Sequence, residues 1–518
     1  MTACSQGAEP MEADERPNVI FIMSDDHTTQ AVGAYGSRLA SLNPTPHLDA
    51  LAAEGAIFRN VFCTNSICTP SRGNIMTGQY SQTNGILTLN DTLPPARQHL
   101  PREMSRLGYQ TAMIGKWHLK AEPAVYDYYQ VLESQGKYFD PEFRSREAGT
   151  WPNNFVNYEG HSTDIITDIT LDWMENKRDP ERPFFLMHHY KAPHDDFEFA
   201  PRYTDYLADV HIPEPANLYE QNQPDFGSPA TLGEGGELRN RIGTSVSDRH
   251  PYRSYTAQYG IEASPRDSAT SAAYQEYLKR YLRCVKGVDD NLGRLFAYLK
   301  EEGLWENTVI IYTGDQGFML GEHDYMDKRW MYDESMRMPF IVHYPPSIPA
   351  GTVNELLINN TDFAPTMLNL VGGETPDYMQ GKSFADYLTG EEPADWRTAT
   401  YYRYWMHLTH HDVPANFGVR TKDYKLIFYY SQPYTTKEVG QGSMWWKEES
   451  YPVEPTPVAW EFYDLRKDPT EIVNRYEDPA YATVIAELKD QLKDLRAELN
   501  ETDADYPRFQ EVIEQHWD

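Results

Sequence analysis

The sequence predicts an α/β fold, in which helices flank a large mixed, mainly parallel sheet and a smaller C-terminal α+β subdomain carries an antiparallel sheet. Three observations predict it. Short apolar runs, typical of strands buried on both faces, end in polar clusters. A long amphipathic helix leads into one of these runs, as in parallel sheets. After Gly372-Gly373 the chain changes to aromatic-rich strands and one further helix.

The first expected strand is NVIFIM, residues 18–23, which is rich in β-branched side chains. A helix is expected at residues 271–303, where apolar side chains from Tyr274 to Leu299 recur at helical spacing. Further buried strands are expected at residues 110–115, 183–190, 308–314 and 339–345.

The C-terminal part is expected to form its own unit. Strands are predicted in TATYYRYW, NFGVRTKDYKLIFYY and EFYDL, and a helix after Asp478-Pro479, with apolar side chains from Val484 to Leu499 on one face. The predicted units are residues 1–16, a disordered tail or lipoprotein-type linker, residues 17–374, the catalytic α/β domain, and residues 375–518, the α+β subdomain.

Residues 203–271 are rich in Pro, Gly, Ser, Asn and Asp and have no steady apolar period. A connection of this length inside a compact domain is usually functional. We expect a rim or lid beside the site, with a passive surface excursion as the alternative.

Composition excludes several classes of function. With 518 residues, 40% of them hydrophobic and 13% aromatic, the chain is typical of a folded protein with a large core. A net charge of −32 argues against a nucleic-acid partner and against an anionic membrane surface. No apolar run reaches the ~20 residues of a membrane span, so no transmembrane segment is expected.

The 4 cysteines are too few and too scattered for a disulfide framework, and no Cys-x-x-Cys pair suggests zinc, so the redox compartment stays open. Thr2-Ala3-Cys4 fits the end of a bacterial lipoprotein signal, with an ordinary disordered tail as the alternative. The first interpretation predicts a protein that is periplasmic, secreted or lipid-anchored at a bacterial envelope.

Polar and charged side chains follow several of the predicted strands. Ligand sites in open α/β sheets lie beyond the carboxyl ends of strands, so we expect these clusters to converge. Carboxylate and amide oxygens are the ligands that hard divalent cations prefer, although each pair alone is also typical of a turn or helix cap. The clusters are Asp25-Asp26, Lys116 with His118, Lys191 with His194, and Asp315-Gln316.

Cys68 lies two residues before Pro70-Ser71-Arg72 in SICTPSRGNIMTGQY. This stretch resembles the signature of the type I, formylglycine-dependent sulfatases of the alkaline phosphatase superfamily. PNVIFIMSDDH, IGKWHL, YKAPH, TGDQGFMLGEHDYMDKRWMYDESMRMPFIVHYP, GVRTKDYKLI and FYDLRKDPTE agree with the family in order and spacing. A small buried thiol is the alternative for Cys68, which fits poorly with its polar neighbours.

The resemblance implies hydrolysis of sulfate esters after Cys68 has been oxidised to formylglycine, which makes a formylglycine-generating enzyme or an anaerobic maturase a partner. Hydrated formylglycine is a geminal diol, and one hydroxyl, deprotonated beside a divalent cation, attacks sulfur and displaces the alcohol. The second hydroxyl then lets the hemiacetal collapse and expel sulfate. Oxygen ligands and the family favour Ca²⁺, with Mg²⁺ as the alternative.

Roles are implied by position. Arg72 would orient the diol, with Lys116 near it and His118 as base for its collapse. His194 would protonate the departing alcohol and, with Lys328, bind the sulfate and the bridging oxygen. Outside the family, Lys328 would be read as a solvated surface group. The implied metal ligands are Asp25, Asp26, Asp315, Gln316 and the modified Cys68.

The substrate implied is a sulfated polysaccharide or oligosaccharide attacked at chain ends, because LGEHDYMDKRWMYDES and DPTE resemble bacterial polysaccharide sulfatases. Ala415-Asn416 stand where many relatives carry a basic residue and a histidine. Two alternatives stay open: a phosphonate monoester or phosphodiester hydrolase of the same superfamily, and an inactive member that binds sulfated glycans. Expected substrate contacts are Lys191, His323, His407 and Arg420, with His410 and His411 as alternatives and His27 in support.

Overall fold

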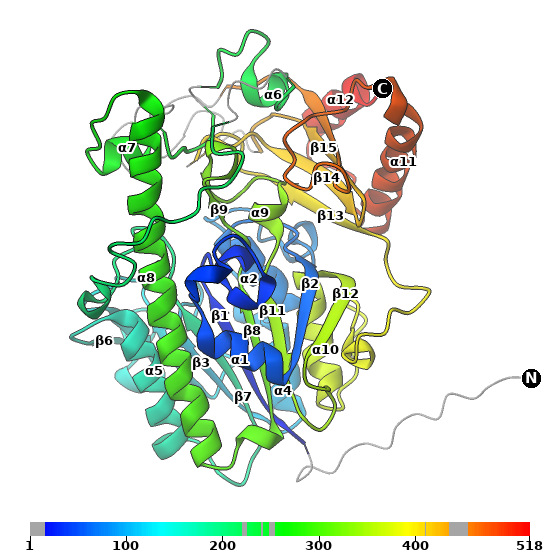
Figure 1. The fold of residues 1–518 in the computed structure, drawn as a ribbon. Helices are drawn as coiled ribbons and strands as arrows, with labels where there is room; N and C mark the ends of the chain where they lie inside the picture. The colour runs from blue at the N-terminus through cyan, green and yellow to red at the C-terminus, as the bar shows by residue number, and fades with distance from the viewer. Residues whose placement is uncertain (1–15, 220–224, 240–241, 248–253, 410, 435–453) are drawn as a thin grey trace, which may run out of the picture.

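The computed structural model describes residues 16–219, 225–239, 242–247, 254–409, 411–434 and 454–518. In this part of the chain, ten strands form one mixed sheet in the order β12-β2-β11-β8-β1-β7-β3-β4-β5-β6 (Figure 1). The strands are β1 Asn18–Ser24, β2 Ala56–Phe62, β3 Gln110–Gly115, β4 Tyr128–Leu132, β5 Glu142–Ser145, β6 Phe155–Asn157, β7 Phe184–Tyr190, β8 Thr308–Gly314, β11 Phe340–His343 and β12 Thr352–Asn359.

The four central strands β8, β1, β7 and β3 are parallel neighbours. Their register places Ile20 of β1 opposite Leu186 of β7 and Ile310 of β8. Because parallel strands end at the same edge, the polar clusters that follow these four strands emerge side by side. The expected convergence of the clusters is confirmed at the level of the backbone.

Helices cover both faces of this sheet, because alternate side chains of each buried strand point to opposite faces. Phe21 and Met23 belong to the core beneath α2, α4 and α10, whereas Ile20 and Ile22 pack toward α1, α5 and α8. The long helix α8 runs along one side of the molecule (Figure 1). The helices are α1 Pro46–Glu54, α2 Cys68–Thr77, α4 His99–Arg106, α5 Ser162–Asp172, α8 Arg266–Glu301 and α10 Phe363–Leu370.

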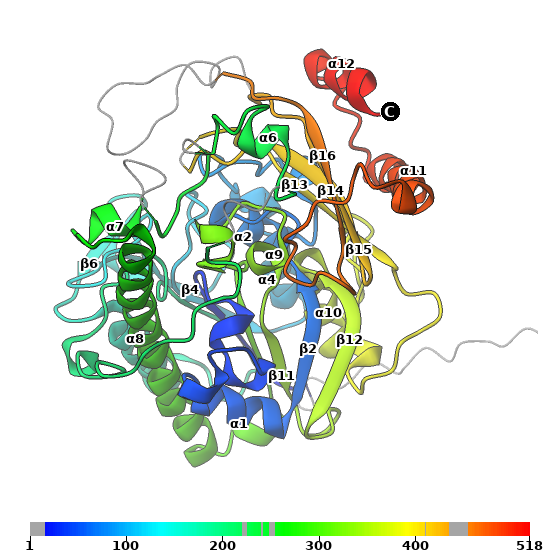
Figure 2. The ribbon, with the colours of Figure 1, turned by 45° about the horizontal axis from the view of Figure 1, so that its top comes forward.

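The C-terminal unit is an antiparallel sheet in the order β13-β14-β15-β16. Ile427 and Tyr429 of β15 face the core of the large sheet, whereas Leu426 and Phe428 face the C-terminal helices. These helices cover the outer side of the small sheet (Figure 2). The elements are β13 Ala399–Tyr404, β14 Asn416–Thr421, β15 Tyr424–Tyr429, β16 Ala459–Asp464, α11 Ala482–Glu498 and α12 Pro507–His516.

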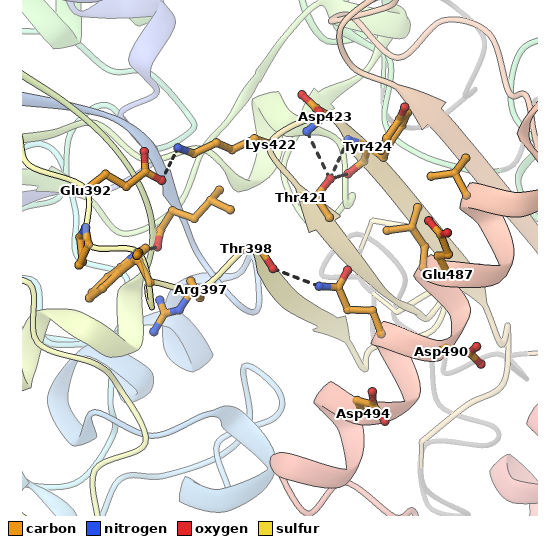
Figure 3. Close-up of a pocket in the computed structure, with 17 residues that line it drawn as sticks. Glu392, Arg397, Thr398, Thr421, Lys422, Asp423, Tyr424, Glu487, Asp490 and Asp494 are labelled. Carbon is orange, nitrogen blue, oxygen red and sulfur yellow. Dashed lines mark hydrogen bonds and ion pairs between the residues drawn. The ribbon is translucent and has the colours of Figure 1, made fainter.

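A cleft of about 990 Å³ lies between the 392–398 segment, the turn from β14 to β15 and α11. Figure 3 shows that carboxylates of α11, among them Glu487, Asp490 and Asp494, lie along one side of it. None of the 17 residues that line this cleft is a predicted site residue.

Several expected boundaries were wrong by a few residues. The long helix begins at Arg266 rather than at residue 271, because Pro265 occupies its N-cap. Strands β7 and β11 each begin one residue after Pro183 and Pro339, which have no N–H to donate to a ladder. Strands β2, β4, β5, β6 and β12 were not predicted. Four of these, β12, β2, β5 and β6, lie at or next to an edge of the sheet, where the apolar runs are short or interrupted.

The expected rim, residues 203–271, contains α6 Pro229–Leu232 and α7 Tyr255–Gln258 within its described part. It packs on the hairpin of β9 Met319–Leu320 and β10 Met326–Asp327, where the N–H of Val246 donates to the carbonyl of Asp324 at 2.9 Å. Two further short helices are α3 Ser81–Asn84 and α9 Asp333–Met336. Among the described residues, no helix combines the length and the apolar character that crossing a membrane needs.

Candidate functional site

Cys68 is the first residue of α2, and every residue of this helix is buried. Gly78 ends the helix in the left-handed conformation, with φ 65°, which favours glycine. The thiol of Cys68 donates to Oδ1 of Asp25 at 3.4 Å. Burial raises the pKa of this thiol to about 12, so the unmodified side chain is a poor nucleophile.

Three buried carboxylates surround this position. Asp25 and Asp26 follow β1, and Asp315 follows the adjacent parallel strand β8. One oxygen from each of the three lies within 4.8 Å of the others. The N–H of Asp26 donates to Oδ1 of Asp315 at 3.1 Å, which fixes the two strand ends against each other.

Three cations balance these carboxylates. Nε of Arg72 donates to Oδ2 of Asp315 at 3.0 Å. Nζ of Lys328 donates to the two oxygens of Asp26 at 2.7 and 2.6 Å, and the ammonium of Lys116 contacts Oδ2 of Asp25. Without such partners, three buried negative charges would be strongly destabilising.

Gln316 offers a further oxygen that a cation could use as a ligand. Its Nε2 donates to Oδ1 of Asp26, while its buried Oε1 has no hydrogen-bond partner among the described residues. An unsatisfied buried carbonyl costs about 1–3 kcal/mol, and a hard cation would use it as a ligand. Burial raises the pKa of Asp26 to about 7, against the attraction of Lys328, and a bound cation would lower it again. This oxygen donor set fits Ca²⁺ or Mg²⁺.

His194 lies beside the same cluster. Its Nε2 is 3.8 Å from Oδ2 of Asp26, and one of its ring nitrogens lies within 4.8 Å of Cys68 and Asp25. Burial lowers the pKa of His194 to about 3, while the neighbouring Asp195 carboxylate opposes the shift. His194 can therefore reach a group bound between Cys68 and the three carboxylates.

Two more predicted residues lie near the charges of the cluster. His118 is 8% exposed, and its Nδ1 has no hydrogen-bond partner among the described residues. Burial lowers the pKa of His118 well below its usual range, next to the charges of Lys116 and Arg72, which makes it a neutral proton acceptor. Burial also lowers the pKa of Lys191, whose Nζ lies 4.7 Å from the ring centroid of Tyr138.

The structure thus brings most predicted site residues together at the ends of β1, β3, β7 and β8 and in the first turns of α2, with Lys328 joining from beyond β10. The assembled set is Asp25, Asp26, Cys68, Arg72, Lys116, His118, Lys191, His194, Asp315, Gln316 and Lys328.

The other predicted substrate contacts are engaged elsewhere. His323 stacks on Phe226, with ring centroids 5.1 Å apart. His407 accepts from the N–H of Ala415 at 3.2 Å, and its Nε2 lies 3.1 Å from the carbonyl oxygen of Glu454, so both ring nitrogens fasten a loop.

Arg420 is also engaged by another side chain. Its Nε and Nη2 donate to the two oxygens of Asp333 at 2.9 and 2.8 Å. His411 lies 3.2 Å from a carboxylate oxygen of Asp327, and His27 contacts the hydroxyl of Tyr312. His410 lies outside the described residues. Substrate contacts by His323, His407 and Arg420 stay predictions.

Sequence reasoning missed three neighbours of the site. Gln135, in the turn after β4, accepts from Nζ of Lys116 at 2.5 Å. Tyr138 donates its hydroxyl proton to the carbonyl of His194, and Asp195 contacts Nδ1 of the same histidine. Gln135 and Tyr138 carry no spacing signal, whereas the adjacent pair His194-Asp195 could have been noticed in the sequence.

The chain is similar to known proteins over nearly its whole length. The family described as Sulfatase matches residues 17–373, and the family described as N-sulphoglucosamine sulphohydrolase, C-terminal, matches residues 321–439 and 453–498. A curated N-acetylglucosamine-6-O-sulfatase of Bacteroides thetaiotaomicron is 36% identical over 529 aligned residues, which cover 95% of this chain and 88% of that protein.

The chain is also similar to solved structures. One, determined in complex with its substrate D-glucosamine-2-N,6-O-disulfate, has a TM-score of 0.77 and 36% identity and covers 95% of this chain and 99% of that chain. A phosphonate monoester hydrolase from Silicibacter pomeroyi has a TM-score of 0.70 and covers 93% of this chain and 95% of that chain. At 22% identity, this second likeness concerns the fold alone.

Proposed function

The chain belongs to the sulfatase family and hydrolyses sulfate esters of carbohydrates, and from this premise we propose that it removes 6-O-sulfate from glucosamine residues at the ends of glycosaminoglycan chains. The observation that supports the reaction is the buried cluster of three carboxylates and three cations around Cys68. The substrate is supported by the 36% identical relatives, one named for 6-O-sulfated N-acetylglucosamine and one bound to a 6-O-sulfated glucosamine.

We further propose that the cluster holds Ca²⁺, with Mg²⁺ as the alternative, through Asp25, Asp26, Asp315 and Gln316. When bound, the cation would draw sulfate oxygens into the site and favour a deprotonated hydroxyl at residue 68. Formylglycine made from Cys68 would supply that hydroxyl, which a buried thiol cannot. A formylglycine-generating enzyme or an anaerobic maturase would make this modification.

Side chains of the protein supply the remaining catalytic functions. Arg72, held by Asp315, presents a fixed guanidinium to the oxygens at residue 68. Lys328 and Lys116 offset the negative charge of a bound sulfate, which collects on its non-bridging oxygens. Neutral His118 accepts the proton that must leave residue 68 before sulfate is released.

His194 has the opposite task, which is to give a proton to the departing sugar oxygen. A sulfate monoanion bound beside Nε2 favours the protonated ring, because a nearby negative charge raises the pKa of an imidazole. Burial alone holds this pKa low, so the proton is expected to be retained only when substrate is present.

The proposed location is outside the cytoplasm, in the periplasm, in the medium or attached by a lipid at a bacterial envelope. Thr2-Ala3-Cys4, which fits the end of a bacterial lipoprotein signal, supports this location. Fractionation of bacterial cells that make the protein, with labelling of Cys4 by lipid precursors, tests it.

The experiment that tests the function uses protein made together with a formylglycine-generating enzyme. It is supplied with glucosamine derivatives sulfated at one known position, and the product is read by NMR. We expect sulfate release from the 6-O position and none from the 2-N or 3-O position. Preference for a phosphonate monoester, or binding of sulfated saccharides without turnover by protein with modified Cys68, would contradict the proposal.

A further inference from the structure

A carboxylate and a hydroxyl that the proposed chemistry does not use both contact the catalytic histidine. Oδ1 of Asp195 lies 2.5 Å from Nδ1 of His194, and the backbone carbonyl of Asp195 lies 2.7 Å from the same nitrogen. Both partners are hydrogen-bond acceptors, so Nδ1 carries a proton and donates it. The other nitrogen, Nε2, is thereby left as the atom that faces the carboxylate cluster, 3.8 Å from Asp26.

Tyr138 fixes the backbone of the same residue. Its hydroxyl donates to the carbonyl oxygen of His194, while its ring lies under the ammonium of Lys191 at 4.7 Å. The N–H of His194 also donates to the carbonyl of Lys191 at 3.2 Å. The histidine is therefore held at its carbonyl, its N–H and Nδ1, which leaves Nε2 to meet substrate.

Exposure differs between the two partners of this pair. The His194 side chain is 12% exposed, whereas that of Asp195 is 47% exposed. A half-exposed carboxylate has little packing to contribute, so its position against Nδ1 is better explained by an action on the ring than by stability. A buried ring that must carry a positive charge needs such a partner.

We propose that Asp195, supported by Tyr138, is a positioning residue that orients His194 and offsets its charge when it acts as general acid toward the sugar oxygen. This inference rests on the proposed role of His194. When the bond between sulfur and the ester oxygen breaks, its electron pair stays on that oxygen, and the proton on Nε2 moves to it. The ring keeps the Nδ1 proton against Asp195 and becomes neutral.

The test is a leaving-group series, because a general acid matters most for a basic leaving alcohol. Sulfate release is measured from 4-nitrophenyl sulfate, phenyl sulfate and the sugar sulfate that the wild type cleaves. Asp195→Ala should lower kcat on the sugar sulfate by about 10-fold to 100-fold and on 4-nitrophenyl sulfate by less than about 3-fold, with KM nearly unchanged. Asp195→Asn should restore part of the loss, because its amide oxygen still accepts from Nδ1.

Matched variants separate orientation from fold. Asp196→Asn removes a second acidic group of the same loop, one that lines a neighbouring pocket, and should leave all substrates unaffected. Tyr138→Phe removes only the hydroxyl and should reproduce the selective loss in weaker form. An equal loss on all substrates, or no loss on any, for Asp195→Ala would overturn the proposal.

The experiments distinguish an error in the proposed substrate from an error in the proposed role of Asp195. If the wild type releases no sulfate from any glucosamine 6-sulfate, the proposed substrate is wrong. The comparison of phenyl with 4-nitrophenyl sulfate then decides the role of Asp195: a steeper decline toward phenyl sulfate in Asp195→Ala than in the wild type supports it, and parallel declines refute it.

Discussion

Arg420 could contact the substrate or support the fold, and the sequence alone does not distinguish these two roles. The family resemblance suggests a contact with sugar, but Arg420 is only 3% exposed, and its guanidinium donates twice to Asp333, at 2.9 and 2.8 Å. It also lies 4.1 Å from the ring centroid of Phe62. We therefore expect Arg420→Met to lower stability and to leave KM for the sugar sulfate within about 2-fold of the wild-type value, because no substrate contact is removed.

The expected loss of stability depends on the partners that Asp333 keeps after Arg420 is replaced. Removing one partner of a buried ion pair costs about 3–5 kcal/mol. Asp333 keeps Lys425, whose Nζ lies 2.8 Å from Oδ1, so its charge stays paired and we expect about 3 kcal/mol, the lower end of that range. With an unfolding entropy of about 2.1 cal/mol/K per residue over this chain, that loss lowers Tm by about 3 °C.

The assay is thermal unfolding of Arg420→Met beside a matched control, Lys422→Met. Lys422 forms an exposed pair with Glu392 at 2.6 Å, so its loss should lower Tm by less than about 1 °C. A tenfold rise in KM for Arg420→Met with an unchanged Tm would refute this reasoning and assign Arg420 to the substrate.

Three further predictions concern the nucleophile, the cation and the dependence of stability on pH. Cys68→Ala should abolish sulfate release without lowering Tm by more than about 2 °C, because the residue fills little volume; residual turnover above about 1% would contradict the role of residue 68. Gln316→Leu, which removes the unpartnered Oε1, should weaken Ca²⁺ binding at least about 10-fold in calorimetry, and unchanged affinity would exclude it as a ligand. Burial raises the pKa of Asp289 to about 7, so the folded state holds a proton that the unfolded state releases, and stability falls as pH rises from about 4 to about 7. Urea unfolding should show a slope of up to about 1.4 kcal/mol per pH unit that Asp289→Asn removes, and equal slopes in both proteins would contradict the assignment.

Sequence patterns predicted the centre of the fold better than its edges. Strands such as β3 and β8 were predicted to the residue, because an unbroken apolar run between polar clusters is what a strand buried on both faces requires. The strands β5 and β6, at one end of the sheet, were missed, because they are short and half exposed. The antiparallel insertion of β11 between β8 and β2 also leaves no local signal.

Some residues of the site could be predicted from the sequence and others could not. Residues that follow a strand directly, such as Asp25 and Asp315, were found because the ends of neighbouring parallel strands meet. Lys328 was found only through the family resemblance, since a lysine in a charged run gives no sign that it will be buried against Asp26. Gln135 and Tyr138 reach the cluster from a turn, and only the folded chain shows which way their side chains point.

The central claim is that residue 68, modified and placed among three carboxylates, makes this chain a glucosamine 6-O-sulfatase. The most direct measurement combines mass spectrometry of the peptide that holds residue 68 with NMR of a glucosamine 6-sulfate before and after incubation with the same protein sample. We expect the thiol to be converted to an aldehyde or its hydrate, and the C6 signals to shift to those of the free alcohol at a rate proportional to the converted fraction. Sulfate release by protein in which Cys68 is wholly unmodified, or an unchanged sugar in the presence of fully converted protein, would contradict the claim.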